Sequence, residues 1–382
     1  MTFHLSDCSG CMACMNICPK DAIITSQSKE GFIIPRILED KCVHCGLCES
    51  VCDYKSREHI GNDIRRVYSF SHFDKRVLNN SSSGGAFTSL SDLFLDKGGV
   101  VFGAVFDNSF NVIHTIASNA SERNRMRGSK YVQSNPQLSY REVKTQLIKR
   151  PVLFVGTPCQ CAGLKAFLNN DYDNLVVVDF LCHGVPSTQL FKDHLSYIKK
   201  NHKGILVDYS FRKKKYGWNS YTNVLSFSRQ SLCRTKDDSS WLAQAFLSFF
   251  SDSYSLRPSC FNCPYRNSHR PSDITIGDFW QIEYLTGKKD KNGVSFMSAN
   301  SPKGEDIISA ISHDGRINEY TIDQVQFRLP NGSKGKPIKY NSFRETYLSG
   351  GYESVLNAFF DNSFKARLRW TIKKIAKRLK IV

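Results

Sequence analysis

The chain has no apolar run that approaches the roughly 20 residues needed to span a bilayer. Its first residues, MTFHLSDCSG, lack the charged and apolar regions of a secretory signal peptide. These two absences predict a cytoplasmic protein. In a reducing cytosol, 14 cysteines indicate metal or redox chemistry and argue against a framework of disulfides.

The composition also excludes a disordered chain, because 41% of the residues are hydrophobic and 26 Phe and 16 Tyr are present. The 382 residues suffice for two or three domains with a sizeable core. No nucleic-acid-binding motif is recognised, so the net charge of +17 predicts at most non-specific affinity for nucleic acid.

Eight cysteines form two runs with the spacing C-x2-C-x2-C-x3-C. The runs are CSGCMACMNIC, with Cys8, Cys11, Cys14 and Cys18, and CVHCGLCESVC, with Cys42, Cys45, Cys48 and Cys52. In such a run the first three thiolates bind one 4Fe-4S cluster, and the fourth reaches the other cluster. The spacing therefore predicts one cluster on Cys8, Cys11, Cys14 and Cys52, and a second on Cys42, Cys45, Cys48 and Cys18.

Zinc fits these runs poorly, because it prefers two C-x2-C pairs separated by a longer spacer. Pro19 suits the first helical position after the fourth cysteine, whereas the second run has Asp53 there. Residues 1–60 resemble bacterial-type two-cluster ferredoxins. As in that fold, AIITSQ and GFIIPRI are expected to form two short strands around a turn.

The next segment contains two loops of uncertain role. Ser83, Gly84 and Gly85 precede an amphipathic helix, and they are either a phosphate cradle or an ordinary loop with a serine cap. RMRGSKYVQS is either a binding loop or a solvated turn. Between them, VVFGAVFD and FNVIHTIAS predict a hairpin around Asp107 and Asn108.

From residue 151 onward the pattern is strand, helix, strand, helix: PVLFVG, QCAGLKAFLNN, NLVVVDF and STQLFKDHLSYIKK. Such a pattern predicts parallel neighbouring strands in an α/β sheet. Cys159 and Cys182 each follow the carboxyl end of a strand, where ligands bind in open α/β sheets. The two cysteines are therefore candidates for one site.

A C-x2-C pair, Cys260 and Cys263, precedes DITIGDFW, a strand that ends near Asp278 and Trp280. With Cys159 and Cys182 the pair makes four thiolates, which predicts a third 4Fe-4S cluster. The alternatives are a structural zinc, or two buried cysteines beside a pair that binds nothing. Cys161 is close enough to substitute for Cys159, and Cys233 is interpreted as an ordinary cysteine.

The last predicted helix, SFKARLRWTIKKIAKRLKIV, is basic and amphipathic. Its apolar face consists of Phe364, Leu368, Ile372, Ile375 and Leu379. Its basic residues, without any acid, are Lys365, Arg367, Arg369, Lys373, Lys374, Lys377, Arg378 and Lys380. The helix either lies on an anionic membrane surface or packs its apolar face on the body. RKKKYGW, near residue 212, is a candidate anion-binding loop.

Several stretches occur in an order typical of one family: the double cysteine run, SSSGGAF, MRGSKYVQS, VLFVGTPCQCAGL, VDFLCHGVPS and RPSCFNCPYRNSHRPSDITIGDFW. Over about residues 1–330 the chain resembles the beta subunit family of coenzyme F-420 (also written F420) hydrogenase/dehydrogenase. The resemblance implies a flavoprotein with FAD and iron–sulfur clusters. Such proteins move electrons between a hydride carrier, typically the deazaflavin F420, and one-electron partners.

The resemblance also implies site residues. A flavin pocket would be lined by Ser83, Gly84, Gly85, Lys130, Tyr131, Thr157, Gln160 and His183, beside a cluster on Cys159, Cys182, Cys260 and Cys263. His183 and Lys130 are the candidate catalytic groups that stabilise charge on the reduced flavin, although His183 could instead fix its loop. Family members commonly have an aliphatic residue after GTPCQ, where this chain has Cys161, so the ligand register stays open.

The expected fold is α+β and α/β. The expected domains are a two-cluster ferredoxin domain (1–60), the first part of a flavoprotein body (65–145), an α/β part with the third cluster site (146–330) and a C-terminal extension with the basic helix (331–382).

The expected function is an FAD- and 4Fe-4S-dependent oxidoreductase that acts on a hydride carrier or small molecule and has a redox partner protein. The resemblance extends to chains associated with cell-surface polysaccharide biosynthesis. The alternatives are an electron-transfer adaptor that docks a catalytic protein, and a zinc-stabilised module fused to a ferredoxin. The expected location is the cytoplasm, with the inner face of the membrane as the alternative.

Overall fold

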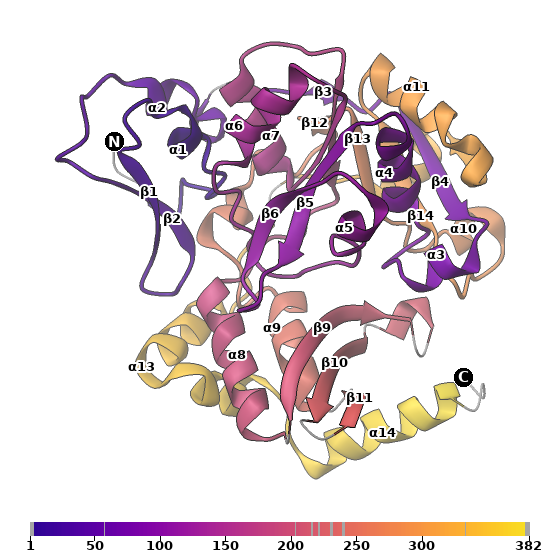
Figure 1. Cartoon of the computed structure of the whole chain (residues 1–382). Coiled ribbons are helices and arrows are strands. Elements are labelled where there is room, and N and C mark those ends of the chain that lie inside the picture. Colours follow the sequence, from indigo (N-terminus) through magenta and orange to yellow (C-terminus); the bar gives the residue numbers. More distant parts are fainter. Residues whose placement is uncertain are drawn as a thin grey trace.

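The N-terminal lobe is built around the two cysteine runs (Figure 1). Helices α1 (Ala13–Ile17) and α2 (Leu47–Ser50) lie within the runs, and η1 (Asp53–Lys55) follows them. Between the runs, β1 (Ile23–Gln27) and β2 (Ile33–Ile37) pair antiparallel, which confirms the two predicted strands. Met12, Met15, Ile23 and Ile33 are buried and form the small core of this lobe.

The computed structural model describes residues 4–56, 58–202, 204–214, 217–220, 222–229, 232–238, 241–332 and 334–378. The side chains of Cys233, Lys374, Lys377, Arg378, Leu379 and Lys380 lie outside the described part of the chain.

An eight-stranded mixed sheet forms the centre of the body, in the order β15-β4-β14-β13-β8-β7-β5-β6. The strands are β4 (Arg66–His72), β5 (Val100–Phe106), β6 (Val112–Ala117), β7 (Val152–Val155), β8 (Leu175–Phe180), β13 (Ile274–Asp278), β14 (Ser295–Ala299) and β15 (Gly315–Tyr320). The four central strands β13, β8, β7 and β5 are parallel, and the outer ones are antiparallel. The predicted parallel pair β7–β8 and the hairpin β5–β6 are both confirmed.

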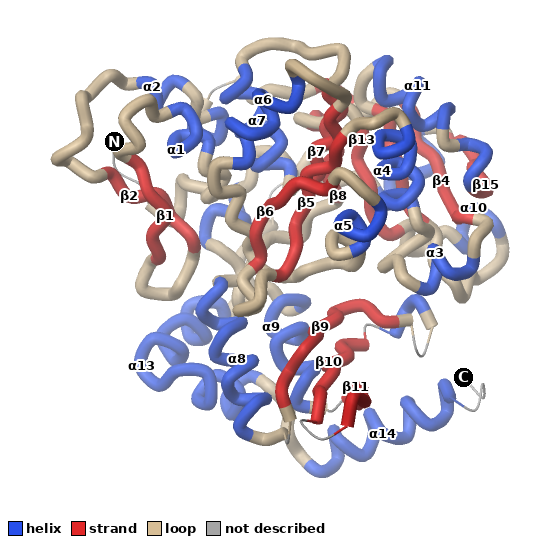
Figure 2. Tube along the Cα trace, in the orientation of Figure 1, coloured by secondary structure: helices blue, strands red, loops and turns tan. Residues whose placement is uncertain are grey.

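Helices cover both faces of this sheet, as Figure 2 shows. The short apolar strands are buried on both faces because of these helices. Leu153 of β7 packs in the core with α4 (Ala86–Asp96) and α11 (Pro302–Ala310), whereas the next residue, Phe154, packs with α6 (Ser139–Leu147) and α7 (Pro158–Leu168). The remaining body helices are α3 (Lys75–Asn79), α5 (Ala120–Asn124), α10 (Glu283–Thr286) and α12 (Ile322–Val325), with η5 (Ser312–Asp314) and η6 (Gln326–Arg328).

A second lobe is built on the antiparallel sheet β11-β10-β9. Its elements are α8 (Thr188–Lys200), β9 (Ile205–Lys213), η2 (Trp218–Ser220), β10 (Thr222–Arg229), β11 (Leu232–Asp238), η3 (Leu242–Gln244), α9 (Ala245–Ser251), α13 (Tyr340–Phe359) and α14 (Phe364–Arg378). Its core is rich in aromatic side chains, among them Phe191, Phe211 and Phe246. After α9 the chain returns to the body through η4 (Pro258–Asn262). It then forms β12 (His269–Arg270), which pairs antiparallel with β3 (Asn62–Asp63).

The predicted fold class is confirmed: a ferredoxin-like N-terminal region precedes a mixed α/β body, and helices follow at the C-terminus. The central sheet takes strands from both sides of residue 146, and the proposed domain boundaries stay predictions. None of the helices in the described ranges is both long and apolar enough to cross a membrane.

Gly84 is placed where only glycine fits. A Cβ atom there would overlap the carbonyl oxygen of Phe70 and lie 2.5 Å from the amide nitrogen of Ser295. The amide of Gly84 also donates a hydrogen bond of 2.9 Å to the hydroxyl of Ser295. Close packing against β4 and β14 therefore explains this glycine without reference to a ligand.

We expect Gly84→Ala to destabilise the protein by about 1–3 kcal/mol, because the new methyl group overpacks two strands. The measurement is the thermal unfolding midpoint, which should fall by several degrees. Gly335→Ala is the matched control, since a Cβ there meets no atom within 4 Å. Equal midpoints for the two variants would contradict the close-packing explanation.

Candidate functional site

The four cysteines of the predicted third set come together at one edge of the central sheet. Cys159 opens α7 directly after β7, and Cys182 follows β8. Because β7 and β8 are parallel neighbours, their carboxyl ends meet at the same edge. Cys260 lies in η4 and Cys263 ends it. A hydrogen bond of 2.8 Å from the amide of Arg257 to the carbonyl of Val185 brings η4 to this edge.

The thiols are close enough to influence one another electrostatically. Burial raises the pKa of Cys182 to about 12, and the nearby Cys260 and Cys159 add to the rise. Burial likewise raises the pKa of Cys260 to about 11, with a contribution from Cys159. Burial raises the pKa of Cys263, and Cys159, Cys260 and Cys182 all add to it. The four sulfur atoms therefore form one group.

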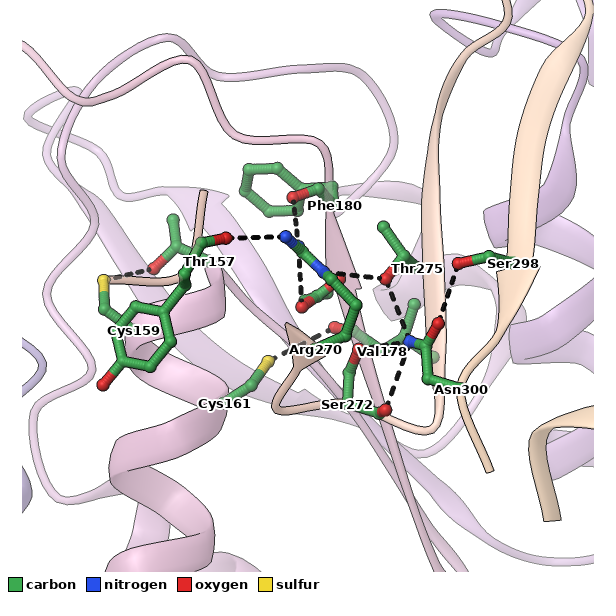
Figure 3. Close-up of polar contacts among 12 residues, drawn as sticks. Thr157, Cys159, Cys161, Val178, Phe180, Arg270, Ser272, Thr275, Ser298 and Asn300 are labelled. Carbon is green, nitrogen blue, oxygen red and sulfur yellow. Dashed lines mark hydrogen bonds and ion pairs between the residues drawn. The ribbon is translucent and has the colours of Figure 1, made fainter. Parts of the chain in front are cut away.

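Cys161 and Cys159 point in different directions from α7, as Figure 3 shows. The side chain of Cys161 is fully buried between α7 and the sheet, and its thiol contacts the carbonyl of Val178 at 3.5 Å. The sulfur of Cys159 instead lies 3.1 Å from the hydroxyl of Thr157. Thr157 and Gln160 form a capping box that holds the start of α7. The geometry thus brings Cys159 to the site and keeps Cys161 in the core.

A network of polar side chains fixes the chain beyond the C-x2-C pair. Arg270 forms an ion pair of 2.8 Å with Asp179 of β8, and both side chains are almost completely buried. Asn300 donates hydrogen bonds of 3.1 and 3.0 Å to Ser272 and Thr275 (Figure 3). The return of the chain from Cys263 to β13 is therefore anchored next to Cys182.

Cys52, the last cysteine of the second ferredoxin run, lies near the cysteines of the first run, while the crossed ligation of the clusters stays a prediction. Burial raises the pKa of Cys11 to about 12, and Cys159, Cys8 and Cys52 add to the rise. Burial also raises the pKa of Cys14, together with Cys11, Cys8 and Cys52. In the second group, Cys18 and Cys48 pack against the same small core. Burial raises the pKa of Cys48, and Cys42 adds to it.

No three His, Cys, Asp or Glu residues in the described part of the chain lie close enough together to hold a single metal ion.

The first ferredoxin group docks directly on the body beside the third group. A Cβ atom on Gly163 of α7 would lie only 3.0 Å from the sulfur of Cys11, so the absence of a side chain permits the contact. The hydroxyl of Tyr140 lies 2.7 Å from the carbonyl of Cys11 and 3.0 Å from that of Gln160. Cys11 and Cys159 are thus neighbours across the boundary between the lobes.

A cavity of about 390 Å³ opens between the body and β9 of the second lobe. It is lined by Asn79, Asn80, Ser81, Ser82, Phe106, Asn124, Arg125, Arg127, Gly128, Ser129, Lys130, Asp208, Tyr209, Ser210, Arg212 and Lys213. Five of these side chains are basic and one is acidic, so the cavity favours an anion. The loop of RMRGSKYVQS, left open by the sequence, therefore lines a cavity.

Lys130 is the basic group of this cavity whose charge is most sensitive to pH. Its amine donates to the carbonyls of Met126, Arg127 and Gly128 at 3.2–3.3 Å. Burial lowers the pKa of Lys130 to about 8. The amine is therefore mostly protonated at neutral pH and loses its charge as the pH rises above 8.

Arg212 belongs to RKKKYGW, the candidate anion-binding loop, of which residues 215 and 216 lie outside the described part of the chain. Its side chain is buried and pairs with Asp278 at 2.9 Å. It also donates to the hydroxyl of Tyr131 at 2.9 Å and lies over the ring of Trp280. Alternation along β9 places Arg212 on the face opposite the core residue Phe211, so no local pattern indicated that it is buried.

A row of side chains leads from the cavity to the cysteines. Tyr131 follows Lys130 and stacks on Phe250 with a ring distance of 4.7 Å. Phe250 lies 4.9 Å from the ring of His183, the residue after Cys182. The imidazole of His183 also contacts Ser253 at 3.0 Å and Lys334 at 3.1 Å. Burial, Lys334 and Arg266 lower the pKa of His183 to about 4, so the ring is neutral at pH 7.

The candidate flavin residues are thus divided between two places. Lys130 lines the cavity and Tyr131 accepts a hydrogen bond from the cavity residue Arg212, while Ser83 donates a 2.7 Å hydrogen bond to the carbonyl of Val294 in the adjoining loop. Gly84 and Gly85 continue that loop into α4, with Gly85 at a φ of 95°. Thr157, Gln160 and His183 lie at the cysteine group, and Tyr131 and Phe250 connect the two sets.

Comparisons with known proteins identify both cysteine-rich regions. Residues 149–325 match the family model for the C-terminal part of the beta subunit of coenzyme F420 hydrogenase/dehydrogenase. Residues 7–56 match the 4Fe-4S dicluster domain. Residues 149–325 are thus similar to the C-terminal part of F420 hydrogenase/dehydrogenase beta subunits. Together with the dicluster domain, this match supports an iron–sulfur electron-transfer oxidoreductase.

A solved chain from the F420-reducing nickel–iron hydrogenase complex of Methanosarcina barkeri is similar in structure, with a TM-score of 0.46 and 18% sequence identity. The similarity covers 78% of this chain and 92% of that one. No curated protein sequence matches the chain.

We expect anion binding in the cavity to weaken as the pH rises through 8, because Lys130, with a pKa of about 8, loses its charge there. A charged hydrogen bond contributes about 1.5–3 kcal/mol, so the affinity should fall roughly tenfold or more. The measurement is calorimetric titration with ADP, as a probe anion, between pH 7.5 and 9.5.

In Lys130→Met the affinity should be low at pH 7.5 and depend less on pH. Lys97→Met, which removes an exposed lysine away from the cavity, is the matched control. An unchanged pH dependence in Lys130→Met would show that another group controls binding.

Proposed function

We propose that the protein exchanges electrons between FAD, held at the basic cavity, and three 4Fe-4S clusters. The observation that best supports this proposal is the row of contacts that runs from the cavity through Tyr131, Phe250 and His183 to the third cysteine group. That group adjoins Cys11 of the first ferredoxin group, which leads in turn to the second. A bound flavin would accept two electrons as a hydride and release them singly.

The third cysteine group suits a 4Fe-4S cluster. Four partly buried thiols converge there from the sheet edge and η4. Thiolates are the usual ligands of such clusters. Structural zinc uses the same four ligands, so it remains the alternative for Cys159, Cys182, Cys260 and Cys263.

The cavity suits the phosphates of FAD. Its volume of about 390 Å³ lies within the range of small-molecule sites, and its basic side chains favour a diphosphate. The proposed flavin-binding residues remain Ser83, Gly84, Gly85, Lys130, Tyr131, Thr157, Gln160 and His183. Lys130, when protonated, would stabilise negative charge. His183, neutral at pH 7 because of its low pKa, would supply a hydrogen bond but no charge.

The hydride partner is proposed to be a small molecule, with the deazaflavin F420 as one candidate, which the match of residues 149–325 to F420 hydrogenase/dehydrogenase beta subunits supports. A redox partner protein that exchanges electrons with the ferredoxin lobe belongs to the same proposal. A role in cell-surface polysaccharide biosynthesis and a cytoplasmic location remain predictions. An adaptor without substrate chemistry is the second candidate, and the basic cavity argues against it.

We expect the anaerobically purified protein to contain about twelve iron atoms and one FAD per chain, because three four-iron clusters are proposed. Cys260→Ala combined with Cys263→Ala should leave about eight iron atoms, since only the ferredoxin clusters persist. The measurements are iron and zinc analysis and the absorbance of released flavin.

Cys161→Ala is the matched control, because Cys161 is buried outside the cysteine group, and it should retain all twelve. Eight iron atoms with one zinc in the wild type would identify a zinc site. Eight iron atoms without flavin, even after reconstitution, would favour the adaptor.

We further propose that α14 binds an anionic membrane surface. Its apolar stripe is exposed, with 80% of Phe364, 46% of Leu368, 56% of Ile372 and 51% of Ile375 accessible. Trp370 contacts Trp241 of the second lobe at 5.9 Å. Because 3.6 residues make a helical turn, Trp370 lies about 200° from Leu368, on the opposite side of the helix.

The contact with Trp241 therefore holds the helix while its apolar stripe points away from the lobe. The basic residues beside the stripe match the charge of anionic lipid, where each Lys or Arg contributes about 1 kcal/mol near the surface. Figure 1 shows α14 at the periphery of the second lobe, which leaves it accessible to a flat surface.

We expect the full-length protein to sediment with vesicles of phosphatidylglycerol and phosphatidylcholine and not with phosphatidylcholine alone. Leu368→Ser combined with Ile372→Ser should lower the partition coefficient at least tenfold, because burying one such side chain contributes about 1.5–3 kcal/mol.

Ile148→Ser combined with Ile338→Ser removes two exposed apolar side chains elsewhere and should bind like the wild type. Equal loss in both double variants, or equal binding to neutral vesicles, would refute the membrane proposal.

A further inference from the structure

Arg257 is a completely buried arginine at the junction of the ferredoxin lobe and the body. Its Nε donates a hydrogen bond of 2.7 Å to the carbonyl of Cys8. Its Nη1 donates to the carbonyl of Ile33 at 2.7 Å and lies 3.2 Å from the side-chain oxygen of Gln133. The guanidinium thus holds the loop that presents the first ferredoxin cysteines.

No carboxylate in the described part of the chain pairs with this guanidinium, and its buried Nη2 has no hydrogen-bond partner there. The other deeply buried arginines differ in this respect. Arg123 pairs with Asp92, Arg212 with Asp278 and Arg270 with Asp179, each at 2.8–2.9 Å. A buried charge without a counter-charge is strongly disfavoured, so an anion is expected near Arg257.

The position of Arg257 indicates which anion this is. Its side chain reaches the carbonyl of Cys8, and its own carbonyl accepts a hydrogen bond of 2.9 Å from the amide of Cys260. Ser259, between Arg257 and Cys260, donates a hydrogen bond of 3.1 Å to the same carbonyl of Cys8. Arg257 therefore lies where the first ferredoxin group meets the segment that supplies Cys260 to the third group.

We propose that Arg257 is a shared counter-charge for the first ferredoxin cluster and the third cluster, and that it raises the reduction potential of both. A cluster ligated by four thiolates carries net negative charge, and taking up one electron adds another. A fixed cation stabilises the reduced form, because net charge and hydrogen bonds set cluster potentials. One electron enters the cluster, no proton is transferred, and the guanidinium keeps its charge. For the third cluster the inference rests on the proposed function, whereas for the first it rests on the dicluster domain.

Two substitutions of Arg257 separate charge from hydrogen bonding. Arg257→Lys keeps the cation and loses most of the hydrogen bonds, whereas Arg257→Gln loses the cation and keeps a donor. The measurement is an anaerobic redox titration of the full-length protein, followed by electron paramagnetic resonance. The second ferredoxin cluster, whose ligand loop Arg257 does not contact, is the internal reference.

In Arg257→Gln we expect the first and third clusters to become harder to reduce, with at least a tenfold shift in the electron distribution relative to the second cluster. For a one-electron couple this is about 59 mV. In Arg257→Lys the distribution should stay within threefold of the wild type.

The inference would be overturned if the reduction potentials of all clusters shifted equally, or if none shifted in Arg257→Gln. It would also be overturned if Arg257→Lys shifted the potential of the first cluster more than Arg257→Gln does, or lost that cluster. This last outcome would assign Arg257 a structural role through its hydrogen bonds.

Iron content is measured in the same samples. Eight iron atoms in the wild type would remove the third cluster and with it that part of the proposed function, while the shift of the first cluster would still test Arg257.

Discussion

The contact between Cys11 and Gly163 is the constraint on which the redox arrangement depends. Electron transfer between cysteine groups requires proximity, and this contact brings the first ferredoxin group against the helix that begins at Cys159. Tyr140 reinforces it by bridging the backbones of Cys11 and Gln160. The missing side chain of Gly163 and the hydroxyl of Tyr140 thus join the ferredoxin lobe to the body, whose core also includes Ala13 and Val51 of that lobe.

The parallel strands supply the second requirement, a rigid edge. β7 and β8 are adjacent and parallel, so Cys159 and Cys182 lie at the same edge of the sheet, and their positions are set by the two strands. η4 is added to this edge through the backbone of Arg257 and Val185. Because the ligands come from short connections to buried strands, the site is organised by the core of the body, which fits an electron carrier that should reorganise little.

Positive charge is distributed unevenly over the molecule, and each cluster of basic residues has its own local explanation. The basic side chains of the cavity line a space that is large enough for an anion. Arg212 is neutralised by Asp278, whereas Arg257 has no carboxylate partner among the described residues and lies between two sets of thiols. The basic residues of α14 flank an exposed apolar stripe. The positive charge is therefore concentrated in separate places, namely the cavity, Arg257 and α14, and each of them is suited to an anionic partner.

The sequence by itself determined the two ferredoxin runs, the parallel pair β7–β8 and the β5–β6 hairpin, because these depend on local spacing and on short periodic patterns. It also predicted the four members of the third cysteine group, through strand ends and a C-x2-C pair. Only the tertiary structure separated Cys161 from Cys159, turned Arg212 inward and placed Arg257 between two groups. The burial of Arg212 and the position of Arg257 depend on contacts between residues more than 60 positions apart, which no local pattern encodes. Cys161 is set apart by its contact with Val178 of the neighbouring strand β8. Likewise, the spacing of residues in SSSGG could not reveal that Gly84 allows close packing against β4 and β14.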